Sequence, residues 1–291
     1  MKHIFLAATL FFLISISSFS QKINGKLTFN QGQNFEIAMT VKTTISQQVM
    51  GQAIDFTVDA TGNHTYKVTN TTEDNTTLNH QVQRITFAFD GMGQKRKFDS
   101  NEEKDLNGPF GPLVKDMLEK KYDIIVDPSG SVKMAIPEKI VLAEGDSRMA
   151  IITSMLKGVL DIVQPPQKGR PSFFKVLPDG EGSKGDTWTT TYDGENGKVD
   201  AAYSLADITD STIVVDFAEN SVTVTKAEMM GSETTTTLNN KSTGKIILDR
   251  ITGIIKEKTI NTESNGNTEA PMGTLPVTSK TTTVITVKPV Q

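Results

Sequence analysis

The segment DGEGSKGD, residues 179–186, gathers oxygen-bearing side chains in a glycine-rich stretch. Calcium prefers flexible loops that supply carboxylate and hydroxyl oxygens at closely spaced positions. The candidate ligands here are Asp179, Glu181, Ser183 and Asp186. The spacing is not that of an EF-hand, and no bidentate acid closes the loop. An ordinary solvated turn is therefore the simpler interpretation, and a calcium site is the alternative.

The sequence offers few histidines for acid–base catalysis or metal binding, because His64 and His80 are the only ones after the first 20 residues. His80 lies between Leu78 and Val82, on the apolar side of an expected strand, which favours a buried, hydrogen-bonded histidine over a base or ligand. His64 follows a Gly-Asn pair typical of turns and is expected in solvent. Two separated histidines without a thiol do not readily form a zinc site.

Other catalytic patterns are missing from the sequence. It contains no nucleophile elbow, no zinc-binding helix motif and no phosphate-cradling loop. Any two acids can meet in a fold and cleave a glycoside, but no pair stands out here. We therefore expect no catalytic residue and no cofactor, and a carboxylate-dependent hydrolase remains an alternative.

An apolar ligand is the third possibility that the residues suggest. Methionine is adaptable, and apolar side chains between a helix and a sheet can line a cavity for a lipid or an apolar peptide. The candidate lining residues are Met149, Ile152, Met155, Leu156, Val159, Phe173 and Phe174. An ordinary core made of the same residues is the plainer interpretation.

The elements that position these residues are mostly strands, because apolar and polar residues alternate along much of the chain. The pattern runs from FEIAMTV, residues 35–41, to TTTVITV, residues 281–287, with abundant threonine that suits a pleated, water-facing surface. In LNHQVQRITFAFDG the apolar parity changes after Val82. A strand cannot swap faces without an extra residue, so we expect a bulge near Gln83–Arg84.

Two helices are expected between the strands. PLVKDMLEKK, residues 112–121, begins with a proline suited to a first helical turn and has an apolar face. DSRMAIITSMLKGVLDIV, residues 146–163, starts with N-cap candidates and stops before Pro165–Pro166. The apolar stripe of this longer helix must be covered, and the apolar face of a sheet is the available partner.

Residues 1–20 have the three parts of a secretory signal, with cleavage expected after Ser20. The apolar run is shorter than the about 20 residues that span a bilayer, so the chain is not expected to span a membrane after cleavage. A lipoprotein anchor needs a cysteine, and the sequence has none. We expect export to the periplasm or exterior of a Gram-negative bacterium. The net charge of −4 argues against a nucleic-acid partner.

Two segments share one hairpin pattern, an apolar run, an aspartate, a glycine and a second apolar run. They are IIVDPSGSVK, residues 124–133, and IILDRITGIIK, residues 246–256. Other landmarks recur in the same order, Gly32–Phe35 with Gly185–Trp188 and Tyr66 with Tyr203. The sequence therefore predicts two similar β units.

The expected fold class is mainly β, of the α+β type. Two similar antiparallel β units form a curved sheet, a half-barrel or a sandwich, and the longer amphipathic helix packs on its apolar face. The expected division is a signal peptide at 1–20, an N-terminal β unit at 21–136, a helical linker at 137–171 and a C-terminal β unit at 172–291.

The order of these motifs resembles an uncharacterised family of secreted bacterial proteins, a domain of unknown function in envelope proteins of Bacteroidetes and Planctomycetes. The matching motifs are an early G-x-x-F strand, a D-x-x-G-x-V hairpin, P-x-G…G-D-x-W at Pro178 to Trp188, and G-K-I-x-x-D-x-x-T-G at Gly244 to Gly253. Some members of that family are lipoproteins, and this chain departs from them by lacking cysteine. The resemblance implies a β-rich envelope protein and supplies no catalytic residue.

Three functions follow from these observations. The preferred one is a non-catalytic envelope protein that binds an apolar ligand such as a lipid, or another envelope protein. A deep apolar pocket would favour it. A polar cleft with two acids of perturbed pKa would favour the hydrolase. A flat, filled sandwich would favour a structural or adhesive module that works through threonine-rich strands and exposed edges.

Overall fold

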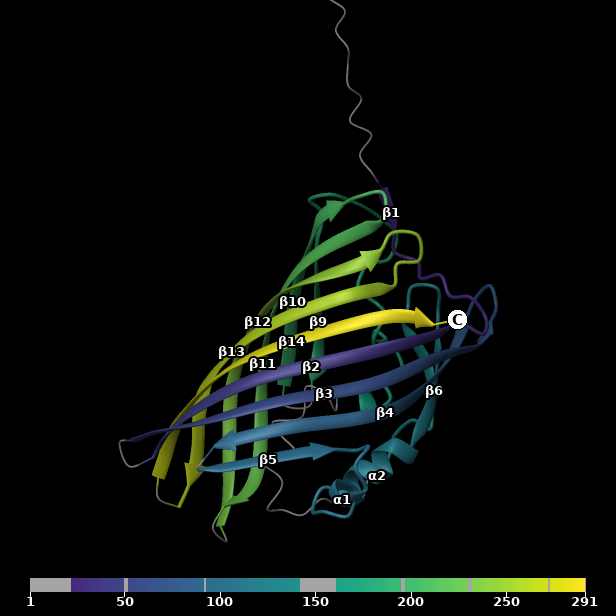
Figure 1. The fold of residues 1–291 in the computed structure, drawn as a ribbon. Coiled ribbons are helices and arrows are strands. Elements are labelled where there is room, and N and C mark those ends of the chain that lie inside the picture. The colour runs from purple at the N-terminus through teal and green to yellow at the C-terminus, as the bar shows by residue number, and fades with distance from the viewer. Residues whose placement is uncertain are drawn as a thin grey trace, which may run out of the picture.

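A computed structural model of the chain describes residues 22–49, 52–91, 93–141, 161–194, 197–229, 232–271 and 273–290. These residues form one 12-stranded sheet, a separate two-stranded pair and two short α-helices (Figure 1). Every strand pairing in the large sheet is antiparallel. The prediction of a mainly antiparallel β fold is confirmed.

The elements follow one another in this order. The N-terminal part contains β1 (Lys22–Asn24), β2 (Asn34–Val49), β3 (Gln52–Thr71), β4 (Thr76–Gly91), β5 (Gln94–Asp99), α1 (Glu103–Leu106), α2 (Gly111–Glu119), β6 (Lys121–Val126) and β7 (Val132–Ile136). The C-terminal part contains η2 (Asp161–Val163), β8 (Glu181–Ser183), β9 (Thr187–Gly194), β10 (Gly197–Ile208), β11 (Thr212–Met229), β12 (Ser232–Asp249), β13 (Ile255–Ala270) and β14 (Gly273–Val290).

The large sheet is open and curved, and both predicted units belong to it. Its strand order is β7-β6-β4-β3-β2-β14-β13-β12-β11-β10-β9, with β5 paired to β4, and the small pair is β1–β8. The first long strand, β2, therefore pairs with the last strand, β14, in the middle of the sheet (Figure 1). Within the described part of the chain, no strand joins β7 to β9, so the sheet is open between them.

The expected bulge lies in β4. Asn63 of β3 pairs with Arg84, and the next residue, His64, pairs with Val82, so Gln83 is the extra residue. Both apolar sets of β4 consequently face the core, as the buried side chains of Leu78 and Ile85 show. The prediction from the change of parity is confirmed.

The placement of His64 in solvent is wrong, because this side chain is only 1% exposed. β3 runs without a break from Gln52 to Thr71, so the Gly-Asn pair before His64 is part of a strand and not a turn. His64 lies opposite Ile37 of β2 and Val82 of β4 on the core side of the sheet.

The short helix expected at residues 112–121 is confirmed as α2, which ends at Glu119 because Lys121 begins β6. Pro112 lies in its first turn, and Val114 and Met117 are buried. None of the helices in the described ranges is long and apolar enough to cross a membrane.

Most of the longer helix expected at 146–163 lies outside the described residues. Its last three residues, Asp161–Val163, form the single 3-10 turn η2. The candidate lining residues outside the described ranges are Met149, Ile152, Met155, Leu156 and Val159. Packing of this helix on the sheet stays a prediction.

The landmarks shared by the two units occupy equivalent positions in the sheet. Phe35 pairs with Tyr66 across β2 and β3, as Trp188 pairs with Tyr203 across β9 and β10. An equivalent backbone hydrogen bond precedes each pair, from the amide of Gly32 to the carbonyl of Val68 (2.9 Å) and from Gly185 to Leu205 (2.8 Å). The register of the two units is therefore the same at these positions, while the domain boundaries stay a prediction.

Candidate functional site

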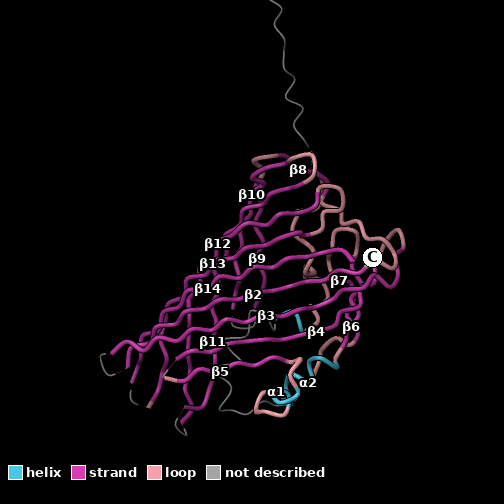
Figure 2. The backbone as a smooth tube through the Cα atoms, viewed as in Figure 1, coloured by secondary structure: helices cyan, strands magenta, loops and turns pink. Residues whose placement is uncertain are grey.

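The inner face of the curved sheet carries the core (Figure 1). We call the end with the turns at 127–131 and 249–254 the core end, and the end where β2 leads to β3 and β11 leads to β12 the distal end. Figure 2 shows loops gathered at the core end, while the long strands extend toward the distal end. Antiparallel partners point to the same side, so rows of inner side chains cross the sheet.

Toward the distal end, the inner residues of β11 to β14 carry mostly hydroxyl groups. This hydroxyl surface comprises Ser221, Thr223, Ser242, Thr262, Ser264, Ser279 and Thr281. The Ser242 and Thr262 hydroxyls are hydrogen-bonded at 2.9 Å, and the Asn240 side-chain amide donates to Thr223 Oγ1 at 2.9 Å. The hydroxyls thus form hydrogen bonds across the strands, and the carboxyl group of Glu219 lies in the same row as Ser242 and Thr262.

The inner residues of β2 to β4 at the same end are apolar. This apolar surface comprises Ile45, Ile54, Phe56 and Phe89, all of them half-buried. Ile45 pairs with Phe56, and the Phe56 and Phe89 ring centroids lie 6.2 Å apart. In contrast, Ile37 on the same face of β2 near the core end is fully buried. The concave face therefore presents an apolar half and a hydroxyl half side by side.

Glu219 of β11 and Lys258 of β13 are half-buried charged side chains on this inner face, and the exposed Arg96 of β5 shares the face opposite Phe89. Burial raises the pKa of Glu219 and lowers the pKa of Lys258, and the charge of each group opposes the shift of the other. The Lys258 ammonium lies 5.0 Å from the ring centroid of Phe217. These charges are a feature that the sequence analysis missed. The signal was present, because Glu219 shares the strand parity of buried Val215 and Phe217.

A second inner cluster contains two histidines and two tyrosines, all buried. His64 Nδ1 and His80 Nε2 are hydrogen-bonded at 3.2 Å, and the hydroxyls of Tyr66 and Tyr122 at 2.9 Å. The Tyr122 hydroxyl also donates to the Ile162 carbonyl at 2.8 Å. Burial, with a contribution from the His64 ring, lowers the pKa of His80 to about 2, so its imidazole is neutral. The prediction of a buried, hydrogen-bonded His80 is confirmed.

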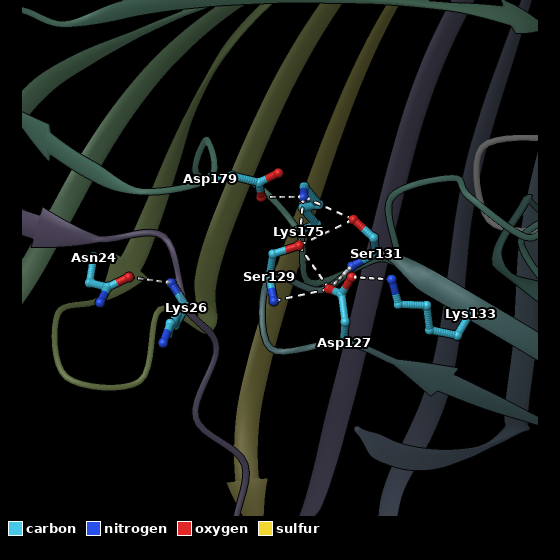
Figure 3. Close-up of polar contacts among 8 residues, drawn as sticks. All are labelled: Asn24, Lys26, Asp127, Ser129, Ser131, Lys133, Lys175 and Asp179. Carbon is cyan, nitrogen blue, oxygen red and sulfur yellow. Dashed lines mark hydrogen bonds and ion pairs between the residues drawn. The ribbon is translucent and has the colours of Figure 1, made fainter. Parts of the chain in front are cut away.

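At the core end, a polar cluster joins the turn after β6 to the segment before β8 (Figure 3). Asp127 Oδ1 accepts hydrogen bonds from the Ser129 hydroxyl (2.7 Å) and the Ser131 amide (2.9 Å). Lys175 Nζ lies 2.9 Å from each of the two serine hydroxyls and 2.7 Å from Asp179. The cluster is therefore a clamp between two segments far apart in the sequence.

The charge balance of the clamp explains why it does not resemble a serine–lysine catalytic pair. Such a pair needs a neutral amine as base, whereas Lys175 Nζ forms an ion pair with Asp179 at 2.7 Å. Burial alone would raise the pKa of Asp127, but hydrogen bonds from Lys133 and the two serines outweigh it and lower the pKa to about 2. The clamp thus contains fixed charges on both sides.

The three acids considered for calcium have separate partners. Asp179 pairs with Lys175, Glu181 pairs with Lys22 across β1 and β8, and Asp186 accepts the amide of Ser183. In the described ranges, no group of three or more histidine or acidic side chains is placed to hold a metal ion. The DGEGSKGD segment forms β8 and a turn, with a positive φ at Gly180 and Gly185.

Phe173 and Phe174 belong to the aromatic core at the core end. Phe174 is 0% exposed, and its ring centroid lies 5.5 Å from those of Phe29 and Phe35. Phe173 is half-buried, with its ring 6.2 Å from that of Tyr66. The structure therefore places these two side chains together, away from the apolar surface at the distal end.

Comparison with protein families gives a match over part of the chain. The sequence model of a family of unknown function (DUF6263) matches residues 170–255. This stretch contains the G-D-x-W motif and the second of the two hairpin turns. No curated protein matches the chain.

Solved structures give only distant similarities. Lipovitellin, solved for its lipid–protein interactions, is 9% identical with a TM-score of 0.46, and the match covers 90% of this chain and 26% of lipovitellin. An outer membrane channel from Pseudomonas putida F1 is 8% identical with a TM-score of 0.27, covering 90% of this chain and 98% of the channel. This chain thus spans about a quarter of lipovitellin. TM-scores this low carry no argument about fold or ligand.

Proposed function

We propose that this protein is an exported, non-catalytic binding protein that holds an apolar ligand, such as a lipid, on the concave face of its sheet. The apolar surface carries the proposal. Its side chains point to the inside of a curved sheet, where apolar residues are normally covered, yet they are half-buried. A concave surface with apolar residues beside a few polar groups is the usual setting of a small-molecule site.

We also propose that the helix expected at 146–163 covers the concave face. Its apolar stripe, formed by Ile152, Met155, Leu156 and Val159, needs an apolar partner. Replacement of Leu156 or Val159 by Asp is expected to unfold the protein, because a buried, unpaired charge is highly unfavourable. A variant with an unchanged melting temperature would show that this helix is not docked.

The direct test is titration with the neutral fluorescent probe N-phenyl-1-naphthylamine. Phe56→Asn and Ile45→Asn are expected to weaken binding about tenfold each, the effect of about 1.4 kcal/mol of lost contact. The matched control is Val224→Asn, at an apolar residue on the outer face near the same end that is already 37% exposed. Equal binding by the wild type and all three variants would contradict the proposal. Native mass spectrometry of protein taken from its host envelope should also reveal a co-purifying lipid.

A structural or adhesive role is the second candidate, favoured by the edge of β9. This threonine-rich strand pairs only with β10 among the described strands, whereas β2, its counterpart in the first unit, also pairs with β14. Exposed edges of this kind can add a strand from a partner. Thr189→Pro should abolish any such association without unfolding the sheet, and Thr189→Val should preserve it. Sedimentation of the wild type and both variants separates these outcomes.

A further inference from the structure

Lys258 is a cation in an apolar part of the concave face. In its row across the sheet it lies between Ile246 of β12 and Ile285 of β14, which are 1% and 5% exposed. Its ammonium faces the ring of Phe217. Gly244 permits this arrangement, because a Cβ at that position would lie 2.5 Å from the Phe217 ring. The lysine is therefore held inside the sheet by a specific local packing.

The charge of Lys258 is only distantly balanced. Glu219 acts on it electrostatically from β11, but the two are separated by β12, and Lys258 forms no ion pair with a carboxylate in the described ranges. An unpaired cation that has lost much of its water is unfavourable by several kcal/mol. A group of this kind is stabilised by an anion that approaches it from the open side of the face.

We propose that Lys258 binds the anionic headgroup of a single-chain amphiphile, such as a long-chain fatty acid, whose acyl chain lies on the apolar surface. This inference rests on the proposed function and adds the chemical class of the ligand. Lys258 shares its row with Met39 of β2, and Ile45 lies six residues further along that strand, about 20 Å at strand spacing. Lys258 itself lies two strands from β2, about 10 Å across the sheet, so an acyl chain that starts at its ammonium runs about 22 Å to Ile45 at the near edge of the apolar surface.

Removal of the Glu219 charge is expected to have the opposite effect on ligand binding to removal of the Lys258 charge. A carboxylate bound to Lys258 would be repelled by the negative charge of Glu219, which acts on the same ammonium. Removal of that charge should therefore strengthen the binding of an anionic ligand. If Lys258 and Glu219 served only to stabilise each other, neither substitution would change the affinity for a charged ligand relative to a neutral one.

The experiment compares palmitate with hexadecanol, which has a chain of the same length and no charge, by displacement of N-phenyl-1-naphthylamine. The wild type is expected to prefer palmitate about tenfold, the effect of one charge-assisted hydrogen bond. Lys258→Met should remove the preference, Lys258→Arg should keep it, and Glu219→Gln should raise it. Lys245→Met, at an exposed lysine on the outer face of β12, is the matched control and should change nothing.

The outcomes separate this inference from the proposed function. Binding of both compounds with equal affinity by the wild type and Lys258→Met would overturn the headgroup assignment and leave the apolar site in place. Binding of neither compound would overturn both. Because Lys258→Arg retains the charge, loss of preference in that variant together with a lowered melting temperature would indicate a structural role for Lys258 and contradict the inference.

Discussion

The turns at 127–131 and 249–254 have the same design in two different surroundings. In each, an aspartate opens the turn and accepts two backbone amides through Oδ1, from Ser129 and Ser131 in the first and from Ile251 and Thr252 in the second. In each, a glycine with positive φ closes the turn, Gly130 at 85° and Gly253 at 70°. The shared sequence pattern therefore corresponds to a shared local geometry.

The surroundings of the two turns differ in what holds them. The amide of Leu27 donates to the Pro128 carbonyl (2.7 Å), and the amide of Thr28 donates to the Thr252 carbonyl (2.9 Å), so one N-terminal segment touches both turns. Each turn also has a basic side chain that anchors it. Lys175 binds the two serines of the first turn, and Arg250 of the second turn donates to the Thr209 carbonyl at 2.8 Å. The segment 169–172 pairs with the first turn and the start of β7, because the amide of Ser172 donates to the Gly130 carbonyl (2.9 Å) and that of Val132 donates to the Arg170 carbonyl (2.9 Å). The comparison indicates that one turn design is anchored in two ways, the first turn to the segment before β8 and the second to the turn between β10 and β11.

The largest effects are expected from the two turn glycines. Gly130→Ala and Gly253→Ala should each lose about 2 kcal/mol of unfolding free energy, because a side chain disfavours positive φ. In addition, the new Cβ would lie 2.6 Å from the Leu27 side chain in the first turn and 3.0 Å from the Lys26 carbonyl oxygen in the second.

Urea denaturation measures both losses. Gly169→Ala is the control, because Gly169 has φ of 81° with no atom near the new Cβ, and this variant isolates the backbone strain. A loss in either turn no larger than that of the control would mean that the close approach of the N-terminal segment is unimportant.

Substitution of the two turn aspartates is expected to give the next largest losses of unfolding free energy, and the two losses should differ. Asp127 lies 2.9 Å from Lys133, whereas Asp249 lies 3.8 Å from Lys256. Asp127→Asn should therefore lose about 2 kcal/mol and Asp249→Asn about 1 kcal/mol.

Because the pKa of Asp127 is lowered to about 2, its contribution is present above the ordinary carboxylate pKa of about 4 and is lost as the pH falls toward 2. Unfolding curves at pH 7 and pH 2.5 should show the wild type and Asp127→Asn converging in acid.

The clamp lysine should have a smaller effect that is confined to the first turn. Lys175 is 18% exposed in its side chain, so Lys175→Met should lose about 1 kcal/mol through its hydrogen bonds to Ser129 and Ser131. A double-mutant cycle with Ser129→Ala should give a coupling energy, whereas a cycle with Thr252→Ala of the second turn should give none. Additive losses in both cycles would show that Lys175 does not stabilise the first turn through its serine.

The smallest effect is expected at Lys256. Its ion pair with Asp249 is long and its side chain is 50% exposed, so Lys256→Met should change the unfolding free energy by less than about 0.5 kcal/mol. The variant is best measured beside Lys133→Met, whose ion pair with Asp127 is shorter. A larger loss at Lys256 than at Lys133 would reverse the ranking of the two turns.

The sequence allowed the strands and their local irregularities to be predicted wherever the pattern was continuous. The change of parity after Val82 located the bulge at Gln83 because side-chain alternation is fixed by the backbone. Turn residues inside strands were misleading. Gly62 and Asn63 lie within β3, because neighbouring strands on both sides override the local preference for a turn.

The candidate site could be predicted only in part. The parity of Glu219 marks it as an inward-facing acid, but its relation to Lys258 depends on two strand pairings that no local pattern encodes. Phe173 and Phe174 were candidates for lining a cavity beside the long helix, and that role stays a prediction. The aromatic partners of Phe174 include Phe29 and Phe35, more than a hundred residues earlier. Long-range pairing decided which of the apolar residues became core.

The pairing of β2 with β14 has a consequence for how the protein is made. A ribosome releases β2 long before β14, and the middle of the sheet cannot form until the final strand is available. Contacts of such long sequence separation are slow to form and leave strand edges exposed in the meantime. The inner edge of β2 therefore stays without its partner strand until β14 has been synthesised.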